Sequence, residues 1–303
     1  MQTVLSRTPG GHRLNYLLSR YVSGQVPPTE ATFRRDVEFA AQYLAAFRKH
    51  GARPIEEAAF YEFGAGWNLI APLTFYSMGA NRQRVVDLRR LLRPELVALT
   101  VERLNRLAER SEGLRLLHGF DGPLRERSLC KVMHDNCGID YSAPFDARNT
   151  GWTSGSVDYI TATKVLANIP EPDLRKIITE CHRILRHDGL AAFVVDYRDH
   201  YAYTDSSIGP YNFLQFSDEE WRRWNPGLHF QNRLRRSDYM AVFDQAGFEI
   251  VEQVDAKPDP AILASLDRLD LSSRFASYDL EEIRVVRSDF VLRKKHTAAE
   301  SRA

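Results

Sequence analysis

Two acidic side chains and a pair of glycines have the spacing of an adenosine-binding site. Glu62 ends an apolar run and is followed by Gly64 and Gly66, after which residues 69–78 form an apolar, helix-like stretch. Asp87 ends a short β-branched run 21 residues after Gly66. A strand that breaks into a Gly-x-Gly turn before a helix makes a floor for an adenosine-type ligand. A carboxylate at the end of the next strand suits the vicinal hydroxyls of a ribose.

Proton-transfer chemistry is indicated by two histidines in an aromatic and arginine-rich segment, residues 198–240. A neutral imidazole accepts a proton near pH 7, which makes His200 and His229 candidate catalytic bases. Aromatic rings suit a flat or sugar-like substrate, and arginine recognises a carboxylate or a phosphate. Ordinary packing and surface positions are the alternative for all of these residues. The candidate substrate-binding residues are Tyr201, Tyr211, Trp221 and Arg235.

No metal site is predicted. Asp196, Asp199, His200 and Asp205 offer oxygen and nitrogen ligands, but none of them falls in a specific ligand-spacing motif. The three cysteines form no CxxC pair, and their odd number favours free thiols in a reducing compartment. We therefore expect a cytoplasmic protein and predict no metal ligand, and a divalent metal held by the three aspartates and His200 is the alternative.

The elements that must position these residues alternate between strand and helix patterns. Because a strand-helix-strand alternation favours a parallel sheet with right-handed crossovers, the carboxyl ends of the strands meet at one edge. A final hairpin-like pair is expected to add an antiparallel strand at the sheet edge. The strand candidates are 58–63, 84–88, 156–162, 190–195, 248–254 and 283–292, with a short apolar-acid step at 138–141; the helix candidates are 12–22, 29–50, 69–78, 94–110, 170–188 and 237–246.

Five segments in this order resemble the class I S-adenosylmethionine-dependent methyltransferases, over roughly residues 56–197. The most specific combination is the first glycine turn with a helix that ends in Arg-Ile-Leu-Arg-His-Asp-Gly. The segments are Glu62-Phe63-Gly64-Ala65-Gly66, Asp87, Ile139-Asp140, Val157-Asp158-Tyr159-Ile160 and Cys181 to Gly189.

The resemblance implies a fold, a cofactor and a set of contacts. The fold would be a Rossmann-like seven-stranded, mostly parallel α/β sheet with helices on both faces and an antiparallel last strand. The glycine turn would lie under the methionine part of S-adenosyl-L-methionine, Asp87 would bind the ribose, and Asp140 would accept from the adenine amino group beside Tyr141. The cofactor-binding residues so implied are Glu62, Gly64, Ala65, Gly66, Asn68, Asp87, Leu88, Asp140, Tyr141 and Thr161.

The sequence departs from the family at two positions. Asn68 stands where many members have a third glycine, and Asn168 where a histidine is common. The first departure has little consequence, because this cofactor has no pyrophosphate to press against the backbone. The second removes one family candidate for acid-base chemistry on the substrate side.

The interpretation is a methyltransferase of a small molecule, most simply an O-methyltransferase of a hydroxyl. N- or C-methylation, an NAD(P)-binding oxidoreductase and a non-catalytic binding protein of the same fold are the alternatives. Leu69 stands where the dinucleotide fingerprint needs a small residue, which disfavours the oxidoreductase. The expected organisation is an N-terminal helical cap (1–52), a methyltransferase domain (53–293) in which 198–240 encloses the substrate as a lid, and a disordered tail (294–303).

Charge and hydropathy limit the partners. The 41 Lys and Arg residues balance 40 Asp and Glu residues, so no overall field favours nucleic acid or an anionic membrane. Thr161 to Lys164 stand where a methyltransferase of nucleic-acid bases would carry an Asn-Pro-Pro-Tyr-like motif. No stretch approaches the roughly 20 apolar residues that span a bilayer. We expect a small-molecule acceptor, no nucleic-acid or membrane partner, and a possible homodimer.

Overall fold

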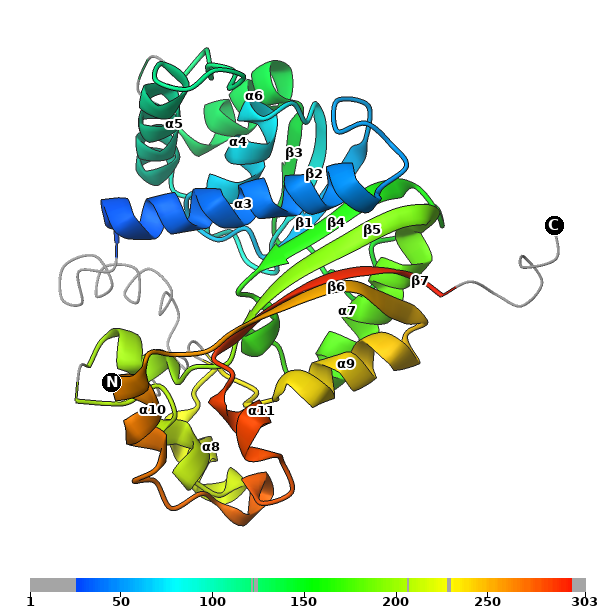
Figure 1. Cartoon of the computed structure of the whole chain (residues 1–303). Coiled ribbons are helices and arrows are strands. Elements are labelled where there is room, and N and C mark those ends of the chain that lie inside the picture. The colour runs from blue at the N-terminus through cyan, green and yellow to red at the C-terminus, as the bar shows by residue number, and fades with distance from the viewer. Residues whose placement is uncertain (1–25, 121, 123–124, 206, 228–229, 296–303) are drawn as a thin grey trace, which may run out of the picture.

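The computed structural model describes residues 26–120, 122, 125–205, 207–227 and 230–295. The predicted helix at 12–22, His229 and most of the predicted tail lie outside the described residues. The described chain forms a twisted sheet with helices on both faces, and a smaller group of helices extends from one end of the sheet (Figure 1).

The sheet has seven strands in the order β3-β2-β1-β4-β5-β7-β6. β1 to β5 are parallel to one another, and β7 pairs antiparallel with both of its neighbours. The predicted fold class is therefore confirmed, including the antiparallel last strand. The strands are β1 (Ala59–Phe63), β2 (Arg82–Val86), β3 (Ile139–Ser142), β4 (Val157–Thr163), β5 (Leu185–Asp196), β6 (Phe248–Ala256) and β7 (Arg287–Lys294).

The expected antiparallel pairing of the last two strands is confirmed, but the expected place of the antiparallel strand at the sheet edge is wrong. β7 is inserted between β5 and β6, so that β6 is the edge strand. The chain between β6 and β7, residues 257–286, is long enough to fold into helices of its own before β7 returns to the sheet. The helix before β5 also ends earlier than predicted, at Ile184, because Leu185 already has an extended backbone and pairs with Val157.

The helices divide between the two faces of the sheet (Figure 1). One face carries helices whose apolar residues pack against β1, β2, β4 and β5. The other face is covered by two helices whose apolar residues pack with β4, β5 and β7. The first group is α3 (Glu30–His50), α4 (Ile70–Ser77), α5 (Pro94–Ala108) and α6 (Glu126–Cys137); the second is α7 (Glu171–Ile184) and α9 (Arg236–Gln245).

A small helical subdomain is built from two separate segments, 197–235 and 257–286 (Figure 1). Its elements share one apolar core, in which rings of the first segment pack against side chains of the second. The many aromatic residues of the predicted lid are thus explained by a core that they share with a second segment. The sequence did not identify that second segment as their packing partner. The elements are η2 (His200–Tyr203), η3 (Asn212–Gln215), α8 (Asp218–Trp224), α10 (Pro260–Leu266), η4 (Ser273–Phe275) and α11 (Leu280–Arg284).

α3 is fixed to the sheet by a buried tyrosine. The Tyr43 hydroxyl donates to the Ala162 carbonyl of β4 at 3.1 Å and accepts from the Val194 N–H of β5 at 3.0 Å. At the start of the helix, the Thr29 side chain accepts from the Thr32 N–H, as an N-cap does. The predicted helix therefore packs directly on the sheet, and its first turns reach the edge where the parallel strands end.

Replacing Tyr43 by phenylalanine is expected to lower the free energy of unfolding by about 1–3 kcal/mol, because a buried N–H loses its acceptor. Urea unfolding followed by circular dichroism measures the change. Tyr76→Phe is the control, since Tyr76 lies on the neighbouring α4 with a partly exposed side chain. Equal unfolding midpoints for the two variants would contradict the bridging role of the Tyr43 hydroxyl.

Candidate functional site

The glycine turn after β1 lies tightly against the loop after β4. Gly64 and Gly66 have φ angles of +75° and +71°, in the left-handed region that favours glycine. The Gly64 N–H donates to the Val86 carbonyl at 2.8 Å, which ties the turn to the end of β2. A Cβ atom at Gly64 would lie 2.5 Å from the Val165 Cγ2, so no side chain fits there. The ends of β1, β2 and β4 consequently converge on this turn.

A cavity of about 420 Å³, here called the turn cavity, opens over the glycine turn. It is bounded by the turn, by the end of β4 and by the first turns of α3. Its lining residues are Asp36, Glu62, Gly64 to Asn68, Ile70, Ala71, Asp87, Leu91, Thr163 to Val165 and Asn168.

A second cavity of about 410 Å³, here called the outer cavity, adjoins the turn cavity and shares Gly64, Asp87, Leu91, Val165 and Asn168 with it. Its other walls are the loop after β3, the start of α7 and two residues of the helical subdomain. These residues are Phe63, Val86, Leu88, Arg89, Phe145 to Arg148, Ile169, Pro170, Asp173, Ile177, Gly227 and Phe230.

Two buried carboxyl groups face the turn cavity. Burial raises the pKa of Glu62 to about 8, against the lowering effect of the Thr161 hydroxyl, which donates to its Oε2 at 3.0 Å. Burial likewise raises the pKa of Asp87 to about 7, although the Gly66 N–H donates to its Oδ2 at 2.9 Å. Both groups therefore change protonation near neutral pH, where a cationic or hydroxyl-bearing ligand favours their ionised forms.

The structure brings together most of the residues predicted to bind a cofactor. Glu62, Asp87 and the turn from Gly64 to Asn68 line the turn cavity, and Leu88 lines the outer cavity. Thr161 is fully buried behind Glu62. Tyr141 is half-buried in β3 and packs with the core beneath α4 and α5.

Asp140 does not lie with these residues. It is the second residue of β3, pairs in register with Arg84, and its Oδ1 accepts from His134 Nδ1 at 2.6 Å. It lines a different cavity, at the edge where β1, β2 and β4 begin. The prediction that Asp140 binds an adenine at the glycine turn is therefore corrected, because the two positions lie at opposite edges of the sheet.

Three of the predicted substrate-binding residues belong to the interior of the protein. Tyr211, Trp221 and Arg235 are at most 5% exposed, and the tyrosine and tryptophan lie in the core of the helical subdomain. The Arg235 guanidinium donates to the carbonyls of Tyr197, Ile283 and Val285. No surface of these side chains is left for a substrate, and the predictions for them are corrected.

Tyr201 is half-buried, and its hydroxyl donates to the Trp224 carbonyl at 2.5 Å. His200 lies in η2, where its backbone N–H donates to the Gln231 side-chain oxygen at 3.2 Å. Neither residue lines the turn cavity or the outer cavity. Their predicted roles stay predictions.

Sequence reasoning missed an ion pair in the turn cavity. Lys164 Nζ lies 2.5 Å from Asp36 Oδ1, and each side chain is about a quarter exposed. Asp36 comes from α3 and Lys164 follows β4 directly, so 128 positions separate them in the chain. A charged residue at the end of the apolar strand 157–163 was the available signal for Lys164, whereas nothing local marks Asp36.

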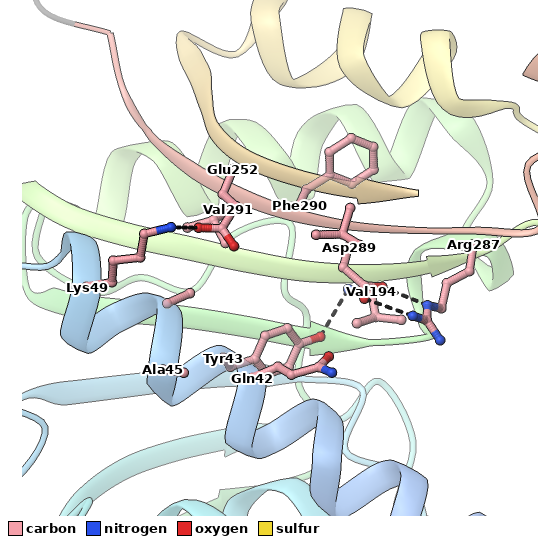
Figure 2. Close-up of a pocket in the computed structure, with 12 residues that line it drawn as sticks. Gln42, Tyr43, Ala45, Lys49, Val194, Glu252, Arg287, Asp289, Phe290 and Val291 are labelled. Carbon is pink, nitrogen blue, oxygen red and sulfur yellow. Dashed lines mark hydrogen bonds and ion pairs between the residues drawn. The ribbon is translucent and has the colours of Figure 1, made fainter. Parts of the chain in front are cut away.

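A further cavity, of about 340 Å³, lies between α3 and the strands β5, β6 and β7 (Figure 2). It contains no residue of the glycine turn. Two ion pairs stand in it, Lys49 with Glu252 at 2.7 Å and Arg287 with Asp289 at 2.9 Å. Among the described residues no group of three or more His, Cys, Asp and Glu side chains could hold a metal ion. In the same part of the chain, no helix is long and apolar enough to cross a membrane.

Comparison with known proteins agrees with this architecture. A family model described as a methyltransferase domain matches residues 123–193, which run from α6 through β5. Over these residues the chain is similar to a methyltransferase domain, and its sheet has the class I methyltransferase fold. No curated protein sequence matches the chain.

Solved structures resemble the methyltransferase domain at low sequence identity. Phosphoethanolamine N-methyltransferase 2 of Haemonchus contortus, in complex with phosphomonomethylethanolamine and S-adenosylhomocysteine, is 10% identical with a TM-score of 0.52, over 98% of this chain and 61% of that one. The [4+2]-cyclase SpnF is 15% identical with a TM-score of 0.49, over 91% and 86%. The YcgJ protein of Bacillus subtilis is 14% identical with a TM-score of 0.45, over 85% and 100%.

The raised pKa values predict how the stability of the ligand-free protein changes with pH. The unfolded chain releases both protons near pH 4, whereas folded Asp87 and Glu62 keep them up to about pH 7 and 8. Their contribution to stability is therefore present below pH 4 and is lost as pH rises to about 8. Asp87→Asn cannot ionise and is expected to flatten this slope.

Urea unfolding at a series of pH values measures the effect, which is on the order of a few kcal/mol over the window. Asp140→Asn is the matched control, because Asp140 is exposed and lies at the other edge of the sheet. If Asp87→Asn and Asp140→Asn gave the same slope, Asp87 would not be a neutral buried group.

Proposed function

We propose that the protein transfers the methyl group of S-adenosylmethionine to a small-molecule acceptor, and that the acceptor atom is a hydroxyl oxygen. The observation that carries the proposal is the pair of adjoining cavities at the carboxyl edge of the sheet, each near 400 Å³. Cavities of this size hold small ligands, and a macromolecular substrate needs an open surface instead. The balanced charge of the chain gives no support to a polyanionic substrate.

Asp87 lines both cavities and is the natural contact for the cofactor's ribose, because an ionised carboxylate accepts from two neighbouring hydroxyls. Glu62 and the glycine turn would hold the amino-acid part of the cofactor in the turn cavity. The apolar walls of the outer cavity, including Leu88 and Phe145, suit an adenine ring. With Asp140 placed elsewhere, no acidic contact to adenine is proposed.

Bound S-adenosylmethionine supplies a methyl group on a sulfonium, which an acceptor attacks in line. The protein's part is to hold the acceptor near that carbon, to exclude water and to remove a proton from the acceptor. Gly227 and Phe230 of the helical subdomain form part of the wall around the outer cavity, so this subdomain supports a site closed to water. His200 is retained as a proposed base only if the segment around it moves toward the cavity.

Calorimetry tests the cofactor, with S-adenosylmethionine, S-adenosylhomocysteine and NADH titrated in parallel. Binding of the two sulfur compounds and not of NADH is expected. Methyl transfer from a radiolabelled donor is then measured on matched hydroxyl and amine compounds. Binding of NADH alone would replace the proposal by an oxidoreductase, and transfer to amines alone would replace the acceptor class.

Asp87→Ala is expected to weaken the affinity for S-adenosylhomocysteine by about tenfold to a hundredfold, since hydrogen bonds to a charged group are lost. Asp140→Ala removes an acid from the neighbouring strand β3 and is expected to leave the affinity unchanged. Calorimetry on both variants decides between the two carboxylates. An effect of Asp140→Ala as large as that of Asp87→Ala would contradict the arrangement of the site.

A further inference from the structure

The ion pair between Asp36 and Lys164 is the charged feature of the turn cavity that the cofactor contacts leave unused. Both residues line the cavity with the glycine turn and with Asn168. They stand on its α3 and β4 walls, whereas Asp87 also lines the outer cavity. An acceptor that enters the turn cavity therefore meets an ammonium and a carboxylate already in contact.

The surroundings hold the Lys164 ammonium in place. Its Nζ lies 4.8 Å from the centre of the Phe39 ring, and the Arg287 guanidinium lies 4.8 Å from the centre of that ring as well. Burial lowers the pKa of Lys164 because it removes water from the ammonium, and Asp36 opposes this effect.

The other charged groups that act on Lys164 come from three elements. Arg35 on α3 disfavours the ammonium, whereas Asp196 at the end of β5 and Asp289 on β7 favour it. Asp196 is itself paired with Arg198 at 2.9 Å. Asp36 is therefore the carboxylate in direct contact with the ammonium.

The backbone conformation of Lys164 indicates that this residue does more than connect α3 to the sheet. Lys164 has a φ of +57°, a left-handed conformation that is costly for a side chain other than glycine. Its N–H still donates to the Val194 carbonyl at 2.9 Å, so the strand pairing continues while the side chain turns toward α3. Such strain persists where the surroundings enforce it, and it concentrates at functional sites.

A second ion pair joins α3 to the sheet without these features. Lys49 Nζ lies 2.7 Å from Glu252 Oε2, near the other end of α3, with the lysine side chain 65% exposed (Figure 2). Lys49 lies outside the turn cavity and has an ordinary helical backbone. The pair of Lys49 and Glu252 therefore serves as a tether, and it is the internal comparison for Asp36 and Lys164.

We propose that Asp36 and Lys164 are the acceptor side of the site, and that they act on a neutral hydroxyl compound such as a phenol. This inference rests on the proposed function and adds the groups that activate the acceptor. The acceptor's O–H bond breaks and its proton passes to an Asp36 carboxylate oxygen, while the Lys164 ammonium holds the oxyanion. The oxyanion's electron pair then forms the bond to the methyl carbon, and the carbon–sulfur electron pair leaves with sulfur.

Charge explains why a hydroxyl suits this pair better than an amine. A protonated amine would bring a third positive charge next to those of Lys164 and the sulfonium, and like charges at short range repel strongly in a partly buried site. A neutral hydroxyl brings no charge, and the oxyanion that it becomes is attracted to the ammonium. The transfer of the proton to Asp36 leaves the net charge of the cavity unchanged.

Absorbance titration of para-nitrophenol into the complex of the protein with S-adenosylhomocysteine tests the pair without turnover, since only the ionised phenol is yellow. The wild type is expected to bind the phenol in its ionised form at a pH below the phenol's own pKa. Its affinity is expected to change little with pH, because Asp36 keeps the proton within the complex.

Variants separate the two roles. Lys164→Met is expected to lose the ionised bound form, and Lys164→Arg to keep it. In Asp36→Asn the proton must leave to solvent, so the affinity for the phenol is expected to rise about tenfold per pH unit below the phenol's pKa. Lys49→Met removes only the ion pair of Lys49, since His50 Nε2 also lies 2.8 Å from Glu252 Oε2, and it is expected to behave as the wild type in both measurements.

The possible failures are distinguishable. If the wild type does not bind S-adenosylhomocysteine, the proposed function fails. If it binds S-adenosylhomocysteine but not ionised para-nitrophenol, or if folded Lys164→Met matches the wild type, the inference on the ion pair fails alone. A pH-independent affinity in Asp36→Asn would remove Asp36 as the proton acceptor. If Lys49→Met changed the binding of para-nitrophenol as much as Lys164→Met does, both ion pairs would have only a structural role.

Discussion

The close approach of Gly64 to Val165 is the constraint on which the site depends. No side chain fits between the turn after β1 and the loop after β4. This contact brings the ends of three parallel strands to one point, because the Gly64 N–H is also bonded to the end of β2. Asp87 and Lys164, which directly follow β2 and β4, are thereby placed on opposite sides of one turn.

Neutral and charged groups are distributed unevenly around that turn. Glu62 and Asp87 are buried carboxyls whose pKa values are raised by desolvation, whereas Asp36 and Lys164 form an ion pair at a partly open wall. A buried carboxyl can stay neutral until a bound ligand stabilises its ionised form. A group in an ion pair already has an oppositely charged partner and needs no ligand for this. The donor side and the acceptor side of the cavity thus differ in electrostatics before any ligand is present.

The parts of the site that the sequence predicted are those set by local spacing. Gly64, Gly66 and Asp87 follow strands whose composition is clear, and parallel strands bring their carboxyl ends together. Asp140 was misplaced because the boundaries of the short strand β3 decide which edge it occupies, and composition does not locate them to a residue. Asp36 required knowledge of how α3 lies on the sheet, which depends on contacts far apart in the sequence such as that of Tyr43.

The helical subdomain shows the same limit in another form. Its aromatic rings indicated that residues 198–240 must pack against something, but the partner segment, residues 257–286, has no feature in the sequence that names its role. Tyr211 and Trp221 therefore looked available to a substrate when they are core residues. The fold class was predictable because strand and helix patterns alternate regularly, whereas burial within an irregular insertion was not.

The two-segment construction of this subdomain also limits how such a chain can be recombined. Arg235 at the end of the first segment donates to the carbonyls of Tyr197 at its start and of Val285 near the end of the second, and the shared core needs side chains from each segment. Neither segment can diverge freely without its counterpart, so the unit of exchange between related proteins is the pair of segments. A recombination breakpoint between β5 and β6 would divide that unit, whereas breakpoints before β5 and after β7 would transfer it whole.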